Sequence, residues 1–346
     1  MPPLLFVPAT SAPDAGPGIA KQTALTLARL DERLRAEHSS LGDAVAVTVY
    51  LRRASDFAAM NDEYRQAFRG TPPTRTTVVT DPLAAADPAA LVEVSIAAVP
   101  SGTDRRSVHP SAWMASPNPY SYAVRAGDLL FLSGLLSRNG RDNSVIEGDA
   151  AVQTKAVIDN AKDLLDAAGL ALSHLVSARV FLTDLADFES MNRVYRENFP
   201  EAPPARATVG ASLTAPPYRV EMTFIASAGQ RRAVDGDGPK NPNLSAAIVA
   251  DDLVFVSGLL APADQLGDPA VETRAILQRI DSTLRAAGSS SAKVRDAIVY
   301  GASPEAARTA AAICRNTFPH ESAVTAAHAS LVTPKATVEI MTIAGR

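Results

Sequence analysis

The sequence has a single cysteine, Cys314, among its 346 residues. One thiol cannot form an intrachain disulfide, and it cannot supply a cysteine-based zinc site, which needs several thiolates. Disulfide-stapled secreted domains and cysteine-ligated zinc domains are therefore excluded.

The chain also lacks long apolar runs and a strong charge of either sign. No stretch approaches 18 consecutive apolar residues, so no transmembrane helix is predicted. Residues 1–16 have no basic start, and prolines interrupt their apolar run, so we expect no signal peptide. The net charge is −4, and basic pairs such as Arg105-Arg106 and Arg231-Arg232 are short and indicate solvated surface. We expect a cytoplasmic protein without nucleic-acid or membrane partners.

Several catalytic motifs are missing as well. No glycine-rich phosphate loop precedes a predicted helix, and no two histidines have the spacing of metal ligands. Ser133-Gly134 lacks the Gly-x-Ser-x-Gly frame of a nucleophile elbow. Apolar residues make up 47% of the chain and charged residues 20%, which is typical of a globular protein with two or three domains. No metal site is predicted.

Two segments repeat one pattern at a spacing of 131 residues (187 minus 56). Residues 56–64 read DFAAMNDEY, and residues 187–195 read DFESMNRVY. The same spacing relates the Gln-Thr pairs at 22–23 and 153–154. A register that holds over this length without a gap indicates an internal duplication.

A third copy is more diverged. Residues 253–260 (LVFVSGLL) repeat residues 129–136 (LLFLSGLL), and residues 338–344 resemble residues 220–226. Polar stretches rich in glycine, proline and arginine, near 100–117 and 228–242, indicate linkers. The predicted modules are 1–99, 115–228 and 240–346.

Each copy predicts the same order of elements. In the second copy, an apolar strand at 129–133 leads into an amphipathic helix that ends at Gly169. A β-branched strand at 176–182, a second helix and two more strands follow. The order β-α-β-α-β-β predicts an α+β module with both helices on one face of a sheet. The bare face of that sheet must be buried, and the other copies are the obvious candidates.

The motifs of the second copy resemble the YjgF/RidA family. They are residues 118–121 (NPYS), Ser133-Gly134, residues 204–209 (PARATV) and Val220-Glu221. Members of this family have a fold like that of the small trimeric chorismate mutases and form trimers around a central barrel, with clefts between subunits. The resemblance therefore implies three tandem chorismate-mutase-like modules arranged as an intrachain pseudo-trimer. It also implies that the fused chain is a monomer or a homodimer.

By the same resemblance, the activity would be that of an enamine/imine deaminase. Such an enzyme hydrolyses small, carboxylate-bearing 2-imino or enamino acids to 2-keto acids and ammonia, without a metal or an organic cofactor. One alternative is a non-catalytic small-molecule-binding or interaction protein that uses the same cleft. Another is a specialised secondary-metabolism hydrolase or lyase acting on a ring-containing acid, which a cleft much larger than a four-carbon acid needs would favour.

Arg206 is the residue expected to hold the substrate. A guanidinium binds a carboxylate through two parallel charge-assisted hydrogen bonds. Arg206 follows two prolines at the start of a predicted strand, and Arg75 has the same position in the first copy. Glu221, matched by Glu93 in the first copy, is expected to orient or deprotonate the attacking water or to shuttle a proton between enamine and imine. A neighbouring arginine would favour the ionised carboxylate.

The resemblance adds further cleft residues. Tyr120 and Asn192 resemble residues that line the family's cleft. Ser133 and Gly134 resemble the turn whose backbone N–H groups meet the substrate carboxylate. Thr208 stands where relatives often have cysteine, and it keeps a hydrogen-bonding group.

The three copies are not equivalent. The first has Pro8-Ala9 at the position of the Ser-Gly turn, and the third has Val324 at the position of the arginine. The third nevertheless keeps Glu339, so a structural role for these glutamates stays open. We predict one competent cleft centred on Arg206, with Arg75 serving a second. The sequence leaves open whether a cleft combines the arginine of one copy with the wall of another.

Overall fold

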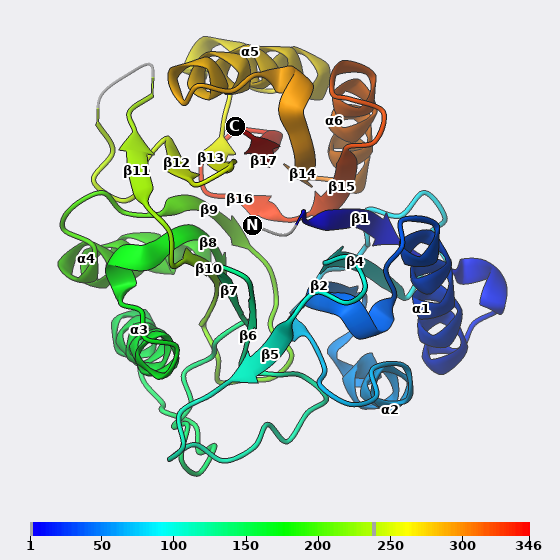
Figure 1. The fold of residues 1–346 in the computed structure, drawn as a ribbon. Helices are drawn as coiled ribbons and strands as arrows, with labels where there is room; N and C mark the ends of the chain where they lie inside the picture. Colours follow the sequence, from blue (N-terminus) through cyan, green and yellow to red (C-terminus); the bar gives the residue numbers. More distant parts are fainter. Residues whose placement is uncertain (1–2, 237–239) are drawn as a thin grey trace.

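The computed structural model describes residues 3–236 and 240–346, so residues 237–239 of the second predicted linker lie outside the described residues. Three modules surround a common centre, with their helices at the periphery and their strands facing inward (Figure 1). Within the described part of the chain, no helix is long and apolar enough to cross a membrane.

The first module contains the predicted order without additions. Its elements are β1 (Leu5–Thr10), α1 (Ile19–Ala36), β2 (Ala44–Leu51), α2 (Phe57–Ala67), β3 (Thr74–Val79) and β4 (Val92–Ala98). The sheet has the order β1-β4-β2-β3. Strands β2 and β3 are parallel because helix α2 carries the chain back to the end of the sheet where β2 began.

The second and third modules repeat this order and add strands. The second contains β5 (Arg105–Val108), β6 (Ala123–Ala126), β7 (Leu129–Leu132), α3 (Ala150–Ala167), β8 (Leu175–Leu182), α4 (Phe188–Asn198), β9 (Ala205–Gly210) and β10 (Val220–Ser227). The third contains β11 (Arg231–Val234), β12 (Ala247–Ala250), β13 (Leu253–Leu259), α5 (Pro269–Ala286), β14 (Val294–Gly301), α6 (Pro304–Thr317), β15 (Ala323–His328), β16 (Ser330–Leu331) and β17 (Val338–Gly345). The three-module α+β architecture predicted from the sequence is confirmed.

Strands β5 and β11 lie in the stretches predicted to be linkers. Each is four residues long and extends the sheet of the module that follows it. The arginine that begins each strand also bridges back to the preceding module. Arg105 donates to the carbonyls of Gly42 and Thr71, and Arg231 donates to those of Ser173 and Ala202. Arg105 and Arg231 therefore join neighbouring modules. The sequence analysis interpreted the pairs Arg105-Arg106 and Arg231-Arg232 as solvated surface, which is wrong for the first arginine of each pair.

The bare faces of the three sheets bury one another. Each module has its own core between its helices and its sheet, but two further clusters draw on all three modules. One of them brings together Tyr50, Phe181 and Tyr300, which have equivalent positions on β2, β8 and β14. The expectation that the copies cover one another's sheets is confirmed, and the result is a central barrel.

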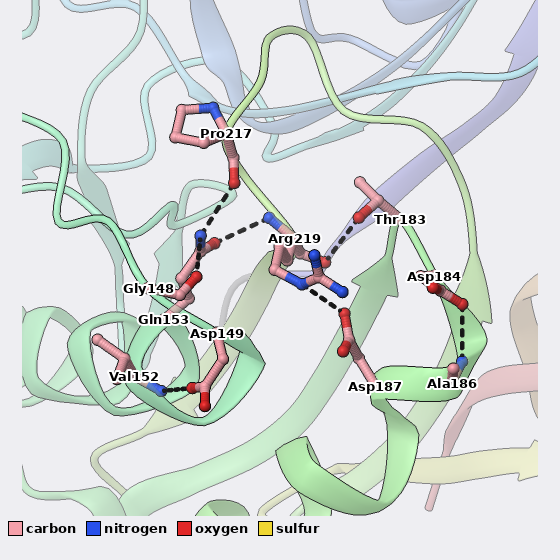
Figure 2. Close-up of polar contacts among 10 residues, drawn as sticks. All are labelled: Gly148, Asp149, Val152, Gln153, Thr183, Asp184, Ala186, Asp187, Pro217 and Arg219. Atoms are coloured by element: carbon pink, nitrogen blue, oxygen red, sulfur yellow. Dashed lines mark hydrogen bonds and ion pairs between the residues drawn. The ribbon is translucent and has the colours of Figure 1, made fainter.

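The repeated Gln-Thr pair has a structural role. At the first turn of α3, the Gln153 side chain donates to the carbonyls of Gly148 (3.2 Å) and Pro217 (2.9 Å) and accepts from the N–H of Arg219 (2.8 Å; Figure 2). It therefore ties the start of the helix to the start of β10. Arg219 is also paired with Asp187 at 2.8 Å, which fixes the start of α4 to the same point (Figure 2).

The other two modules have the same clamp. Gln22 donates to the carbonyls of Gly16 and Ala89 and accepts from the N–H of Leu91. Glu272 stands at this position in the third module and accepts from backbone N–H groups, including that of Val338 at 3.1 Å. The glutamine repeated near the start of the first helix in the first two modules thus marks the point where that helix is tied to the sheet.

We expect Gln153→Ala to lower the free energy of unfolding by about 2–3 kcal/mol, because it leaves two carbonyls and one N–H without partners. Urea unfolding followed by circular dichroism measures the change. The matched control is Lys155→Ala on the same helix, whose exposed side chain forms only a surface pair with Asp159 and should shift stability by less than about 0.5 kcal/mol. Equal effects of the two variants would contradict the assigned role.

We also expect the native mass of the protein in solution to equal that of one or two chains. Three fused modules already close the barrel, so the bare sheet faces that drive trimerisation of separate subunits are buried within one chain. Size-exclusion chromatography with light scattering provides the measurement, and a mass of three or more chains would contradict this architecture.

Candidate functional site

The clefts form where the arginine strand of one module meets the Ser-Gly turn of the next. The backbone N–H of Arg75 on β3 donates to Ser133 Oγ (2.9 Å), and that hydroxyl donates in turn to the carbonyl of Ser121 (2.7 Å). The N–H of Gly134 donates to the carbonyl of Arg75 (3.0 Å). We call this junction of the first and second modules the Arg75 cleft.

The second and third modules meet in the same way. The N–H of Arg206 on β9 donates to Ser257 Oγ (2.8 Å), which donates to the carbonyl of Ser245 (2.6 Å). We call this junction the Arg206 cleft. The chain therefore presents two related clefts, each built from halves of two modules.

The structure separates residues that the sequence analysis grouped. Arg206, Asn192 and Thr208 belong to the Arg206 cleft, whereas Tyr120 and Glu221 belong to the Arg75 cleft. The reason is the sheet order, in which β8 and β10 lie between β9 and β7. Three strand spacings separate the arginine strand of a module from its own Ser-Gly turn by about 14 Å. The structure thus decides the pairing that the sequence left open: each cleft combines the arginine of one module with the wall of the next, and Arg206 does not share a cleft with Glu221 or Tyr120.

The backbone of the Ser-Gly turn is also used differently from what was expected. The N–H of Ser133 donates to the carbonyl of Tyr122, and the N–H of Gly134 donates to Arg75. Both donors are thus engaged in joining strands and modules. The expectation that they face a substrate carboxylate is not met in this conformation of the turn.

In the Arg75 cleft, a buried guanidinium lies among aromatic rings. Arg75 is only 4% exposed, and its guanidinium carbon lies 4.8 Å from the ring centre of Tyr64, 5.3 Å from that of Tyr120 and 5.5 Å from that of Phe57. Its Nη1 atom is buried without a hydrogen-bond partner among the described residues. Burial lowers the pKa of Arg75, because removing a cation from water disfavours the charged form.

Glu221 lies against the turn in the same cleft. A Cβ atom at position 134 would lie 1.8 Å from Glu221 Oε1, so only glycine leaves room for the carboxyl group. Burial raises the pKa of Glu221 to about 8, although the backbone of Thr77 and the charges of Arg179 and Arg75 act in the opposite direction. The neighbouring arginine favours the ionised form, as expected, but desolvation has the larger effect on the pKa.

In the Arg206 cleft, Arg206 is 2% exposed and stacks on Tyr195, with 4.5 Å from the guanidinium carbon to the ring centre. Its Nη2 donates to Asn192 Oδ1 (2.7 Å). Three buried polar atoms have no partner among the described residues: Arg206 Nε, Asn192 Nδ2 and Thr208 Oγ1. Burial raises the pKa of Glu339 to about 8, with Arg206 acting in the opposite direction.

The junction of the third and first modules has no guanidinium at this position. Val324 replaces the arginine, and the joining hydrogen bond runs the other way. The N–H of Ala9 in the turn donates to Thr325 Oγ1 on the strand (3.0 Å), whereas in the other junctions the N–H of the strand arginine donates to a serine of the turn. Burial raises the pKa of Glu93 to about 7, and the backbone of the 84–85 segment and the charge of Arg308 in the third module partly offset this. Glu93, which was expected to contact substrate, lies at this junction rather than in the Arg75 cleft.

The sequence analysis missed the aromatic platform of each arginine. Phe57 and Tyr64, and Tyr195 in the second module, belong to the repeated DFxxMNxxY segment. The third module has Ala311 and Cys314 in place of its Asn and Tyr, and it has lost the arginine as well. Because the third module lost the tyrosine and the arginine together, the sequence contained a signal that these two residues form one site.

Within the described ranges, 3–236 and 240–346, neither arginine has a carboxylate within the 4.0 Å of an ion pair. A buried cation without a counter-ion is costly, and its natural partner is an anionic ligand. The same described residues contain no group of three or more His, Cys, Asp or Glu side chains that could hold a metal ion.

Comparison with known proteins identifies the family. The family described as Endoribonuclease L-PSP matches three stretches of the chain, residues 9–100, 111–228 and 239–345. The chain belongs to this family. The three tandem matches confirm the repeat and, with relatives named RutC and Reactive Intermediate Deaminase A, the YjgF/RidA resemblance.

Individual members of the L-PSP family match one module each. A RutC family protein of Sulfurisphaera tokodaii is 41% identical over 111 residues, which is 32% of this chain and 89% of that protein. The 3-aminoacrylate deaminase RutC of Acinetobacter baylyi is 37% identical over 108 residues, 31% of this chain and 86% of the relative. The solved structure of the YjgF gene product of E. coli is 28% identical, with a TM-score of 0.34, and covers 36% of this chain and 98% of its own.

We expect protein stability to fall as pH rises from about 4.5 to about 8. The folded-state pKa values of Glu221, Glu339, Glu93 and Asp296 are raised to about 8, 8, 7 and 7 by burial. The folded state therefore binds more protons than the unfolded state in this window, and each group lowers the unfolding free energy by up to about 1.4 kcal/mol per pH unit.

The test is the unfolding free energy of Glu339→Gln measured from pH 5 to pH 9. Its stability relative to the unchanged protein should increase with pH through this window. The exposed residue Glu147, changed to Gln, provides the control and should give a constant difference. A constant difference for Glu339→Gln as well would show that its carboxyl is ionised in the folded state.

Proposed function

We propose that the protein is an imine deaminase that hydrolyses small 2-imino and enamino acids to 2-keto acids and ammonia in the Arg75 cleft. The observation that supports this most strongly is a buried guanidinium whose Nη1 atom has no partner among the described residues, near a phenol and a buried carboxyl group of the next module. Arg75 thereby takes the role that the sequence analysis gave to Arg206.

Substrate binding follows from the charge of Arg75. The carboxylate of a 2-imino acid accepts hydrogen bonds from the guanidinium and supplies the missing counter-ion. The rings of Phe57 and Tyr64 hold the guanidinium plane in one orientation, so little freedom is lost when the ligand binds. Tyr120 lies over the same group and must move aside for the ligand to enter.

The hydrolysis needs a proton donor beside the C=N bond. Water adds to the imine carbon, the nitrogen takes up two protons in turn, and the C–N bond breaks as ammonia leaves and the hydroxyl oxygen, which gives up the second proton of the water, forms the carbonyl. With its raised pKa, Glu221 is protonated at neutral pH and can give its proton to the nitrogen, or to the β-carbon of an enamine. It then regains a proton from the added water. Such help typically contributes about 10²–10⁴-fold in rate.

The name of one relative supports this substrate class. The A. baylyi member of the L-PSP family is named a 3-aminoacrylate deaminase, and 3-aminoacrylate is an enamino acid. The competing non-catalytic function would use the same guanidinium to bind a carboxylate, without accelerating its reaction.

The deciding assay generates 2-iminopropionate in situ from an amino acid and traps the free imine with semicarbazide. We expect micromolar protein to compete with the trap. Arg75→Ala should lower kcat/KM by about 10²-fold or more, because two charge-assisted bonds are lost. Arg206→Ala is the matched variant of the other cleft and should retain the activity. No acceleration by the unchanged protein would favour the binding function, and full activity of Arg75→Ala would refute the assignment of the cleft.

The pH dependence tests the role of Glu221 separately. We expect kcat/KM to be level at neutral pH and to fall as pH rises through about 8, because the proton donor is lost. Glu221→Gln should lower kcat by at least about 10²-fold and abolish this dependence. A profile unaltered by the substitution would mean that Glu221 is structural.

A further inference from the structure

The single tryptophan of the chain lies in a row of rings that ends at Arg75. The indole of Trp113 contacts the ring of Tyr122 edge to face, with 5.1 Å between the ring centres and 89° between the planes. Tyr122 contacts Tyr120 in the same way, at 6.0 Å and 84°. Tyr120 in turn lies over the guanidinium of Arg75. Three rings therefore connect the guanidinium of the proposed reaction site with Trp113.

The tryptophan end of this row is held in place by the surrounding chain. Trp113 is 8% exposed and belongs to the core of the second module. A Cβ atom at position 140 would lie 2.1 Å from the indole, so the ring packs directly on the backbone of Gly140. The N–H of Met114 donates to the carbonyl of Gly140 (3.0 Å), which joins the two loops. Trp113 is thus the anchored end of the row.

The other end of the row has space beside it. A cavity of about 40 Å³ borders the rings of Trp113, Tyr120 and Tyr122. This exceeds the roughly 10–15 Å³ that one water molecule needs. The other walls of the cavity are Gly134, residues of the segment 135–143, which include Arg138 and two asparagines, and Asn160. The ring of Tyr120 is therefore not fully packed on this side, and it can shift away from Arg75.

Tyr120 and a ligand compete for the same guanidinium. A ring over a guanidinium is an attractive contact, and a bound carboxylate would replace it by charge-assisted hydrogen bonds. Edge-to-face contacts between rings are attractive as well, so Tyr122 and Trp113 add to the stability of Tyr120 in its position over Arg75. The row of rings therefore helps to determine how readily the cleft opens.

The Arg206 cleft has no such row. Leu244 and Ala246 have the positions of Tyr120 and Tyr122, and Arg206 stacks only on Tyr195 of its own module among the described residues. A ligand in that cleft therefore has no rings through which it could affect Trp113. The other arginine cleft thus provides an internal control.

We propose that Trp113 is a positioning residue of the Arg75 cleft, which holds Tyr120 over Arg75 through Tyr122 and keeps the cleft closed until a ligand displaces Tyr120. The displacement is transmitted through Tyr122 to the indole. This inference rests on ligand entry at Arg75, which is part of the proposed function, but it does not rest on the reaction that follows. It adds a closed state of the cleft and names the residues that maintain it.

Trp113 reports on its own environment, because it is the only tryptophan of the chain. The test follows its fluorescence while the full chain is titrated with propionate, a small carboxylate that does not absorb at the wavelengths used. We expect a saturable shift of the emission, which Arg206→Ala retains and Arg75→Ala abolishes. Propionate binding at Arg75 that is seen by calorimetry without any change in emission would overturn the proposal.

The affinity of the propionate site that Arg75→Ala removes tests whether Trp113 holds Tyr120. Measured by calorimetry, this affinity should rise about threefold or more in Trp113→Ala, because Tyr120 then competes less well for the guanidinium. Trp113→Phe keeps a ring and should return the affinity to that of the unchanged protein. Met114→Ala, which truncates the exposed neighbouring side chain, is the control and should have no effect. Equal affinity of Trp113→Ala and the unchanged protein would overturn the proposal.

A second variant covers the case in which Trp113→Ala fails to fold. Gly140→Ala leaves every ring in the chain but adds a methyl group where the indole lies, so it should shift the emission of Trp113 without ligand and raise the affinity for propionate. An unchanged affinity despite a shifted emission would overturn the proposal.

The two proposals can fail separately. If the emission of Trp113 responds to propionate through Arg75 but the unchanged protein has no deaminase activity, the proposed function fails and this inference stands. If the protein has deaminase activity that depends on Arg75 but the emission does not respond to propionate bound there, this inference fails and the proposed function stands.

Discussion

The contact on which the structure depends is the hydrogen bond between an arginine strand and the serine of the next module's turn. It joins Arg75 to Ser133 and Arg206 to Ser257, and it fixes where each guanidinium lies relative to the neighbouring carboxyl group. Because this bond uses the backbone of the arginine, the side chain remains free to turn into the cleft. Assembly of the barrel and formation of the clefts are thus one event.

Fusion of the modules allows the clefts to differ. In a trimer of identical subunits all clefts have the same residues, whereas here each half-cleft has its own sequence. Tyr120 lies over Arg75 in one cleft, Leu244 has the equivalent position in the second, and Val324 removes the guanidinium from the third junction. The third junction still packs into the core shared by all three modules, so the modules remain closed around that core without its arginine.

The sequence predicted the modules well because their signals are local. The repeat, the order β-α-β-α-β-β and the residues of both arginine positions can be read along the chain. Strands β5 and β11 were missed because each has only four residues, partly exposed and flanked by glycine and proline, and is held as a strand by pairing with the next module. The role of Gln153 as a clamp could not be predicted either, because one of its partners, Pro217, is distant in sequence and is brought close only by folding.

By itself, the sequence determined which side chains are available: two arginines at equivalent positions, three equivalent glutamates and two Ser-Gly turns. Only the tertiary structure decided how these combine. A module's arginine and its own turn lie on opposite sides of one sheet, so Arg206 shares a cleft with Glu339, and Arg75 shares one with Glu221. The direction of the glutamate pKa shifts was decided there too, because burial between the modules raises these pKa values more than the nearby positive charges lower them.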